Sequence, residues 1–315
     1  MQKTIKMSLF TIGLICLLLM VTPATSIVHA AVNCSDPGVV CKSGAINSNE
    51  TWTSDNIYVI TADLTISSGV TVTINPGVIV KFNYYYTHNI LVDGTLNVNG
   101  TSTNKVYFTS ERDDTLGGDT NGNGATNSPA AGQWESIRFR SGSDGTWTHA
   151  ELRYGGDKGG AIALSGSSPS FDNLTVKKSE LAAITALPTD MPTITNFSAQ
   201  DTPRGGLNFQ GGTVTGNITW SQSDIVHIIS SDVTVNDGAT LTISPGVIVK
   251  FHYYYTHNLL VDGTLNVNGT ASDKVYFTSE RDDTLGGDTN GNGATNSPAA
   301  GQWESIRFRS GSDGT

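Results

Sequence analysis

The residues most capable of chemistry lie in one acidic, Gly-rich segment that occurs twice. Its first occurrence contains the motif Asp-x-Asn-x-Asn-Gly over residues 119–124, in which alternate side chains offer oxygen atoms and a glycine permits a sharp turn. This alternation is typical of the first half of a calcium-binding loop. The pattern departs from the EF-hand loop at its twelfth position, where Ala130 stands in place of the bidentate glutamate.

Other carboxylates could replace that missing ligand. Glu111, Asp113 and Asp114 precede the motif and could supply a carboxylate from the opposite limb of the loop. We therefore predict structural calcium, with the weak affinity of extracellular modules, on the order of 10⁻⁴–10⁻³ M. The alternative is a loop of Asx turns that needs no ion. The predicted ligands of the two occurrences are Asp113, Asp114, Asp119, Asn121, Asn123, Asp282, Asp283, Asp288, Asn290 and Asn292.

The acidic segment belongs to a longer internal repeat with a fixed offset of 169 residues. Residues 81–146 and 250–315 differ at only five positions, and weaker similarity continues upstream of both. An internal repeat of this kind indicates an array of similar structural units. The differences are Asn83/His252, Ile90/Leu259, Ser102/Ala271, Thr103/Ser272 and Asn104/Asp273.

The elements that position the acidic segment are predicted to be short strands. From Ile57 onward, runs of Val, Ile, Thr, Tyr and Phe alternate with Gly, Asn, Asp or Pro, and no helical period follows residue 30. The runs return about every 20 to 25 residues, which is typical of one solenoid coil, whereas Asn-Gly and Asp-Gly turns alone would favour hairpins. We expect Ile66, Val92 and Ile137 at equivalent points of successive coils, with residues 111–133 as one long insertion.

After the insertion, Ile137 and Phe139 are expected to face the core while Arg138 and Arg140 face outward. The chain at this point resembles the right-handed parallel β-helix proteins, the architecture shared with pectate lyases. The resemblance covers nearly all of the chain beyond residue 30, but its motifs specify coil geometry and not chemistry. The segments that carry the resemblance are residues 76–82, 108–110, 152–156 and the strand that begins at Ser167. The predicted fold class is therefore all-β, a right-handed parallel β-helix with a long Asp/Asn/Gly-rich insertion in each repeat.

The resemblance also implies an enzymatic alternative. Pectate lyases, as a family, use carboxylate-bound calcium beside an arginine to remove a proton from a uronate sugar, and Arg138 or Arg140 would take the place of that arginine. Both occurrences carry the carboxylates identically, which favours a structural or binding module over one catalytic site per helix. We therefore predict no catalytic residues, with a polysaccharide lyase as the alternative.

Two runs of aromatic residues offer a second kind of site. Three consecutive tyrosines interrupt a coil in each occurrence, and at least one ring of each run must point outward in a strand or turn. Exposed rings suit sugar stacking or protein contact, and packing against the neighbouring insertion is the alternative. The predicted ligand-binding residues are Tyr84, Tyr85, Tyr86, Tyr253, Tyr254 and Tyr255.

The amino-terminal residues predict export. Lys3 and Lys6 precede an apolar run over residues 9–21, and small residues precede a cleavage site after Ala30, as in a secretory signal peptide. We therefore expect a secreted or cell-surface protein without a membrane span beyond the signal. Export permits disulfides, so Cys34 and Cys41 are predicted to form one bridge, with two buried thiols as the alternative.

Charge and length complete the prediction. The chain has 18 Lys and Arg residues, two of them in the signal peptide, against 28 Asp and Glu residues, so phosphate backbones would repel it and nucleic acid is excluded as a partner.

We expect a cap at residues 31–56, a first repeat unit at 57–225 and a second at 226–315. The predicted role is a non-catalytic scaffold for adhesion or glycan binding, whose partner is an extracellular polysaccharide or surface glycoprotein. An inert stalk is a further alternative.

Overall fold

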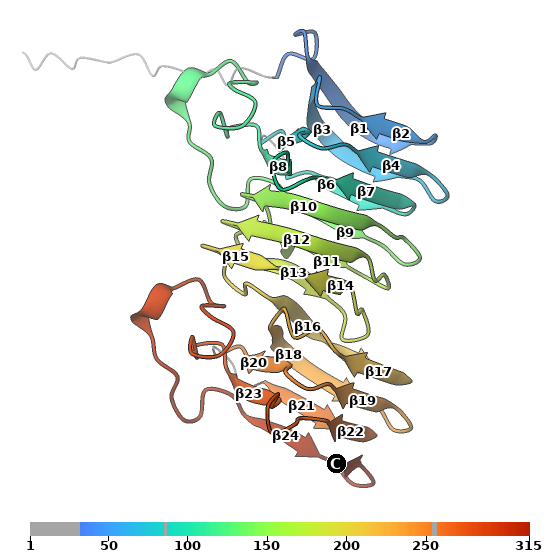
Figure 1. Cartoon of the computed structure of the whole chain (residues 1–315), viewed down its shortest axis with the longest axis vertical. Coiled ribbons are helices and arrows are strands. Elements are labelled where there is room, and N and C mark those ends of the chain that lie inside the picture. Colours follow the sequence, from blue (N-terminus) through green and yellow to red (C-terminus); the bar gives the residue numbers. More distant parts are fainter. Residues whose placement is uncertain (1–31, 85–86, 254–256) are drawn as a thin grey trace, which may run out of the picture.

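The computed structural model describes residues 32–84, 87–253 and 257–315 (Figure 1). Its strands stack along one axis, and successive coils pair in parallel. The predicted signal peptide, residues 1–30, lies outside the described residues, as do Tyr85, Tyr86, Tyr254 and Tyr255.

The first repeat unit and the cap before it contain seventeen of the strands. These are β1 (Val39–Ile46), β2 (Glu50–Trp52), β3 (Ile57–Ile66), β4 (Thr71–Ile74), β5 (Ile79–Phe82), β6 (Asn89–Val92), β7 (Thr95–Asn99), β8 (Val106–Ser110), β9 (Ser136–Phe139), β10 (Thr146–Arg153), β11 (Gly160–Leu164), β12 (Ser170–Lys177), β13 (Ala182–Ala186), β14 (Thr193–Thr195), β15 (Ser198–Gln200), β16 (Leu207–Val214) and β17 (Asn217–Trp220).

The second repeat unit contributes the remaining strands, and the helices are single 3₁₀ turns. The strands are β18 (His227–Val235), β19 (Thr240–Ile243), β20 (Ile248–Phe251), β21 (Asn258–Val261), β22 (Thr264–Val267), β23 (Tyr276–Ser279), β24 (Ser305–Phe308) and β25 (Asp313–Gly314); the 3₁₀ helices are η1 (Gly124–Thr126) and η2 (Gly293–Thr295). The predicted all-β, right-handed parallel β-helix is confirmed.

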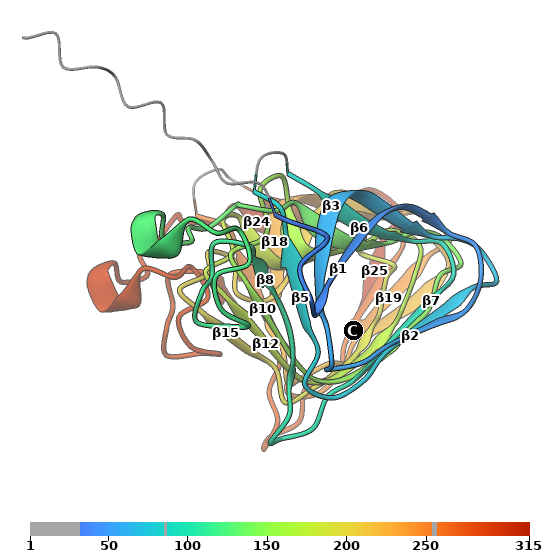
Figure 2. The same cartoon turned by 90° about the horizontal axis from the view of Figure 1, so that it is seen from above.

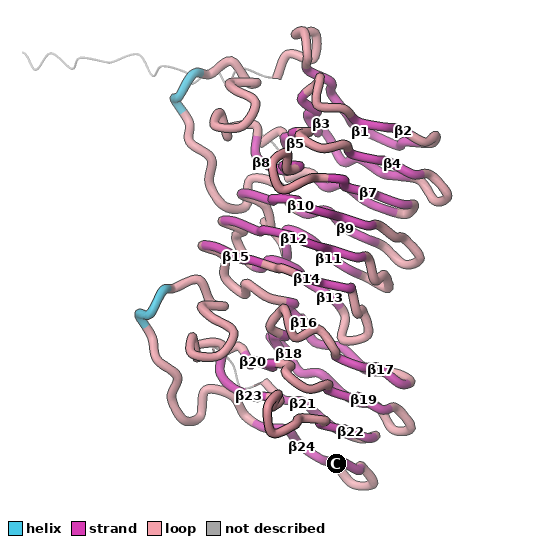
Figure 3. The backbone as a smooth tube through the Cα atoms, viewed as in Figure 1, coloured by secondary structure: helices cyan, strands magenta, loops and turns pink. Residues whose placement is uncertain are grey.

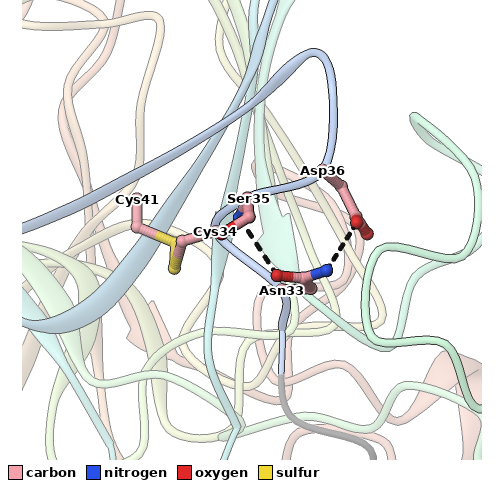
Figure 4. Close-up of a disulfide and its surroundings, with 5 residues drawn as sticks. All are labelled: Asn33, Cys34, Ser35, Asp36 and Cys41. Atoms are coloured by element: carbon pink, nitrogen blue, oxygen red, sulfur yellow. Dashed lines mark hydrogen bonds between the residues drawn. A yellow bond between two sulfur atoms is a disulfide. The ribbon is translucent and has the colours of Figure 1, made fainter.

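The expectation of an irregular cap at residues 31–56 is wrong in part. Strand β1 pairs in parallel with β3 from Val39 to Ile46, and β2 pairs with β4. Apolar residues such as Ile46 and Trp52 are buried there, because these strands close the end of the core. The structure joins Cys34, which precedes β1, to Cys41 within β1 in a disulfide with 5.5 Å between their Cα atoms (Figure 4).

The predicted register is right for the first coils and two residues wrong across the insertion. Ile66 pairs with Val92 as expected, but Val92 then pairs with Phe139, and Ile137 pairs with Ile90. The inward and outward assignment survives this error because two residues is one full period of a strand. Ile137 and Phe139 are fully buried, as predicted.

The rows of strands change between the two repeat units. Strand β20 is the sequence equivalent of β5, which pairs with β3 and β8. Yet β20 stacks in the row that runs through β9, β11, β13, β16 and β18. The outward face of β9, which carries Arg138, therefore continues along the axis into the face of β20.

The core fills the space enclosed by the coils (Figure 2). Apolar side chains at paired positions stack on one another, as Val80, Phe108 and Leu152 do. Larger rings also stack, with centroids 4.3 Å apart for Phe82 and Trp134. Each coil therefore buries its apolar side chains against its neighbours.

No helix in the described part of the chain is both long and apolar enough to cross a membrane.

Candidate functional site

We call residues 111–135 insertion 1 and residues 280–304 insertion 2. Insertion 1 connects β8 to β9 and insertion 2 connects β23 to β24, each with a single 3₁₀ turn, and the two project from one side of the stack (Figure 3). Insertion 1 bends back over β3 and β5, where Gly117 has a φ of +69° and lies against Ile57 and Ile79. A Cβ atom on Gly117 would lie 2.7 Å from the Cδ1 atom of Ile57, so only glycine permits this approach.

A buried lysine lies beneath each insertion. Lys81 points outward from β5 but is fully buried, and its ammonium donates a hydrogen bond to the carbonyl of Gly118 at 2.6 Å. In the second copy, Lys250 donates to the carbonyl of Gly287 at 2.8 Å and to Oγ1 of Thr289 at 3.0 Å. Each insertion therefore closes over a cation that the sheet supplies.

Burial lowers the pKa of Lys81, and the insertion opposes this effect. The carboxylates of Asp114, Asp113, Asp119 and Glu111 all act to raise the pKa. The same balance holds at Lys250, where burial lowers the pKa and the equivalent carboxylates raise it. The acidic segment therefore serves in part as the counter-charge of its own lysine.

Asp113 and Asp282 are committed to hydrogen bonds inside the insertions. Oδ2 of Asp113 accepts a hydrogen bond from the hydroxyl of Thr109 at 2.8 Å, and Oδ1 accepts one from Thr115. Arg153 lies 3.5 Å from the same carboxylate, which is almost fully buried. The side chain of Asp282 binds the equivalent threonines of the second copy in the same way. These two predicted ligands therefore stabilise the turn that begins each insertion.

The Asp-x-Asn-x-Asn-Gly motif folds around its own first carboxylate. Oδ2 of Asp119 accepts a hydrogen bond from the amide of Gly124 at 2.7 Å, and Oδ1 accepts one from the amide of Asn123 at 3.2 Å. The amide of Asn123 also donates to Oδ1 of Asn121 at 3.3 Å. Asp288 and Asn290 repeat these contacts in insertion 2. The Asx turns of the ion-free alternative are therefore present in both copies, and the calcium prediction stays a prediction.

Several oxygen atoms in this region have no hydrogen-bond partner within the described residues. In insertion 1 these include Oδ1 of Asp114 and Oδ1 of Asn123, and in insertion 2 the equivalent atoms of Asp283 and Asn292. Burial raises the pKa of Asp114, and Asp119 adds to the increase. The described residues contain no group of three His, Cys, Asp or Glu side chains placed to share a metal ion. Any ion here would therefore depend on amide or carbonyl oxygens as well.

The two arginines of the lyase alternative do not lie among these carboxylates. Arg138 pairs with Glu135 at 3.2 Å, and Arg140 pairs with Asp93. Arg138 lies on β9 and Arg140 directly follows it, and β9 belongs to a row of strands different from that of β5. The arginine that lies beside Asp113 is Arg153.

The first tyrosine of each run packs against the neighbouring insertion. The guanidinium carbon of Arg112 lies 3.1 Å from the ring centroid of Tyr84, and that of Arg281 lies 3.6 Å from the ring of Tyr253. These are cation–π contacts, which match the packing alternative for these two residues. The other predicted tyrosines are outside the described residues.

A groove of about 330 Å³ lies on the outward face of β9, β11, β13 and β16. Arg138 and Lys158 border it, and both approach the carboxylate of Glu135, at 3.2 Å and 3.7 Å. Small residues such as Gly160 and Ala163 form part of its lining. Because the rows change between the copies, β18 and β20 continue this face along the axis. Insertion 2 lies against β20 and against the residue before β18.

Residues 44–166 match the family model described as the pectate-lyase like beta helix domain. This part of the chain is similar to that family, and its parallel β-helix fold agrees with the match. No curated protein and no solved structure matches the chain. The matched domain includes all of insertion 1, and the second copy repeats the segment from Lys81 onward almost without change.

Sequence reasoning missed two features of this β-helix domain. Lys81 stands alone between Val80 and Phe82 in an otherwise apolar run, and Lys250 repeats that placement, which was the available signal. The second feature is the carboxylate of Glu151, which lies within 3.3 Å of cationic groups on Lys105, Arg153 and Lys177. That cluster joins β10 to β12 and to the residue before β8, which cannot be read from sequence spacing.

Proposed function

We propose that the protein is an exported, non-catalytic β-helix scaffold that binds an extracellular polysaccharide or surface glycoprotein, with calcium bracing its insertions. The observation that carries the proposal is the internal use of the insertion carboxylates. Asp113 accepts a hydrogen bond from Thr109 on the preceding strand, Asp119 accepts one from an amide of its own loop, and the same bonds recur in the second copy. A general base must instead be able to reach a substrate proton.

The glycan-binding part of the proposal is supported by the groove on β9, β11, β13 and β16. Its volume falls within the range of small-molecule sites, and it is open along the face of the stack. Arg138 and Lys158 provide donors at its border, while its small lining residues permit close approach of a sugar ring. Arg138 lines this groove, whereas Arg140, the residue after β9, is not among its lining residues.

The calcium part is supported by oxygens in both copies that have no hydrogen-bond partner in the described part of the chain. Asp114 and Asn123 in insertion 1, and Asp283 and Asn292 in insertion 2, each hold such an atom next to the Asx turns. Buried polar atoms without partners are costly, and a hard cation with oxygen ligands would satisfy them. Calcium would neutralise the acidic segment and fix the path of the loop.

The proposal is tested by native electrophoresis of residues 31–315 through gels that contain a panel of neutral and acidic polysaccharides. We expect slower migration in at least one gel, without loss of polymer. Arg138→Ala should weaken the retardation, roughly tenfold in apparent affinity. Arg140→Ala is the matched control, because its side chain is equally exposed, at 41%, and it lies outside the groove.

Two results would contradict the proposal. Loss of polymer, together with unsaturated products absorbing in the ultraviolet, would establish a lyase, and Arg138→Ala would then abolish product release. Free migration through every gel would leave a stalk without a ligand of its own.

A further inference from the structure

Insertion 2 contacts the end of the first repeat unit. The carbonyl of Thr289 accepts a hydrogen bond from the amide of Gly205 at 2.7 Å. Gly291, with a φ of +68°, lies directly against the backbone of Thr202 and Pro203, and a Cβ atom there would be 3.0 Å from the carbonyl carbon of Thr202. The turn at residues 201–205 connects β15 to β16, so insertion 2 holds the junction between the copies.

The contacts to the junction alternate along the chain with the predicted calcium ligands. The side chains of Asp288 and Asn290 accept hydrogen bonds from backbone amides in the Asx turns, and Oδ1 of Asn292 has no hydrogen-bond partner within the described residues. The intervening residues, Thr289 and Gly291, make the contacts to the first repeat unit. An ion held by the first set would therefore fix the backbone of the second.

Thr289 also connects the junction to the buried lysine. Its side chain is almost fully buried, accepts a hydrogen bond from Lys250 at 3.0 Å and donates one to the carbonyl of Glu280 at 3.3 Å. The carboxylate of Glu280 is 2% exposed and has one oxygen without a hydrogen-bond partner within the described residues. Thr289 therefore lies beside Glu280, a buried residue whose carboxylate has an oxygen without a hydrogen-bond partner in the described part of the chain.

We propose that calcium binding in insertion 2 stiffens the junction between the repeat units through Thr289 and Gly291. This inference rests on the proposed calcium site. Ordering of the loop by the ion removes part of the conformational freedom that opens the contact between Thr289 and Gly205. Rigidity of the stack at this point would then depend on the calcium concentration outside the cell.

Site-resolved amide hydrogen exchange on residues 31–315 tests the inference, with the amide of Gly205 as the reporter. If opening at this amide requires release of the ion, calcium at ten times its Kd should slow exchange about tenfold. The amide of Leu207, which donates to the carbonyl of Val226 at 2.9 Å, is the reference within the same strand region. Its exchange should change much less.

Variants in the two insertions separate the junction from calcium binding in general. Asp288→Ala should abolish the effect of calcium at Gly205, whereas Asp119→Ala, the same change in insertion 1, should leave it intact. Gly291→Ala introduces a Cβ at the junction, and should reduce protection of the Gly205 amide while insertion 2 still binds calcium. Gly122→Ala is its matched control, with similar backbone strain at a φ of +66° and no place at the junction.

Calcium binding is followed by equilibrium dialysis of the same samples, so the two proposals fail in different ways. If no ion binds, the calcium site is wrong and this inference with it. If insertion 2 binds an ion but exchange at Gly205 is unchanged, only the inference is overturned. Loss of the effect in Asp119→Ala would also overturn it.

Discussion

Insertions 1 and 2 have the same sequence but differ in one neighbour. Insertion 1 lies over Ile57 and Ile79, and insertion 2 lies over the equivalent positions in the second copy, but insertion 2 also contacts the turn before β16. Their internal hydrogen bonds are nevertheless the same. In each copy a threonine hydroxyl donates to Asp113 or its equivalent Asp282, and the Asx turns are repeated. The comparison shows that the fold of the loop is local, while its outer contacts depend on where the repeat places it.

The copies differ most at one position beside the insertions. Asn83 in the first copy is His252 in the second, where its Nδ1 atom lies 2.7 Å from Oε1 of Glu280. Lys250 has a second bond, to Thr289, that Lys81 lacks among the described contacts. Insertion 2 is therefore held by His252 and Lys250 in addition to its internal hydrogen bonds.

The largest expected effect comes from removing the buried lysines. Lys81→Met and Lys250→Met each leave a group of carboxylates without their internal cation, so each should lower the free energy of unfolding by about 3 kcal/mol or more. Calorimetric unfolding measures this, with the exposed Lys158→Met as control. Because the bonds inside the loops are the same, both variants should be strongly destabilised. A neutral effect of Lys81→Met would show that the local account is wrong.

The next effect concerns the histidine that replaces a tyrosine between the copies. Tyr58 stacks on Trp52, and its equivalent His227 stacks on Trp220, fully buried. Burial lowers the pKa of His227 from 6.5 to about 4. Below pH 6.5 the unfolded chain takes up a proton that the folded chain refuses until about pH 4. Stability should therefore fall across this interval, by about 3 kcal/mol in total.

Chemical unfolding between pH 7 and pH 4 measures the contribution of His227. His227→Phe removes the titrating group while keeping a ring against Trp220, so the variant should lose less stability over this interval than the unmodified chain. Equal pH dependence in the two proteins would assign the effect to other groups.

The sequence was sufficient for the fold because the coil pattern is repeated in every strand. Alternation placed Ile137 and Phe139 inside and Arg138 outside, and the pairing of Ile66 with Val92 followed from spacing alone. The pairing register of β9 could not be predicted, because the length of the insertion does not show which residue is the first to pair with the preceding coil. Phe139, and not Ile137, therefore pairs with Val92.

The candidate site was less predictable, because it depends on how the insertions fold back. The predicted calcium ligands lie close together in the sequence and could be named from it. The burial of Lys81, by contrast, depends on Gly118, which is 37 residues away. The change of row that puts β20 on the continuation of β9 depends on the turns after β13 and β15. Such contacts are set by tertiary packing and leave no local pattern.

The central claim is that each insertion is an independent, carboxylate-lined calcium module and not part of a catalytic site. Equilibrium dialysis of residues 31–315 against labelled calcium tests it most directly. We predict two ions per chain, one ion in Asp119→Ala, one in Asp288→Ala and none in the double variant. Binding that survives in the double variant, or no binding to the unmodified chain, would contradict the account.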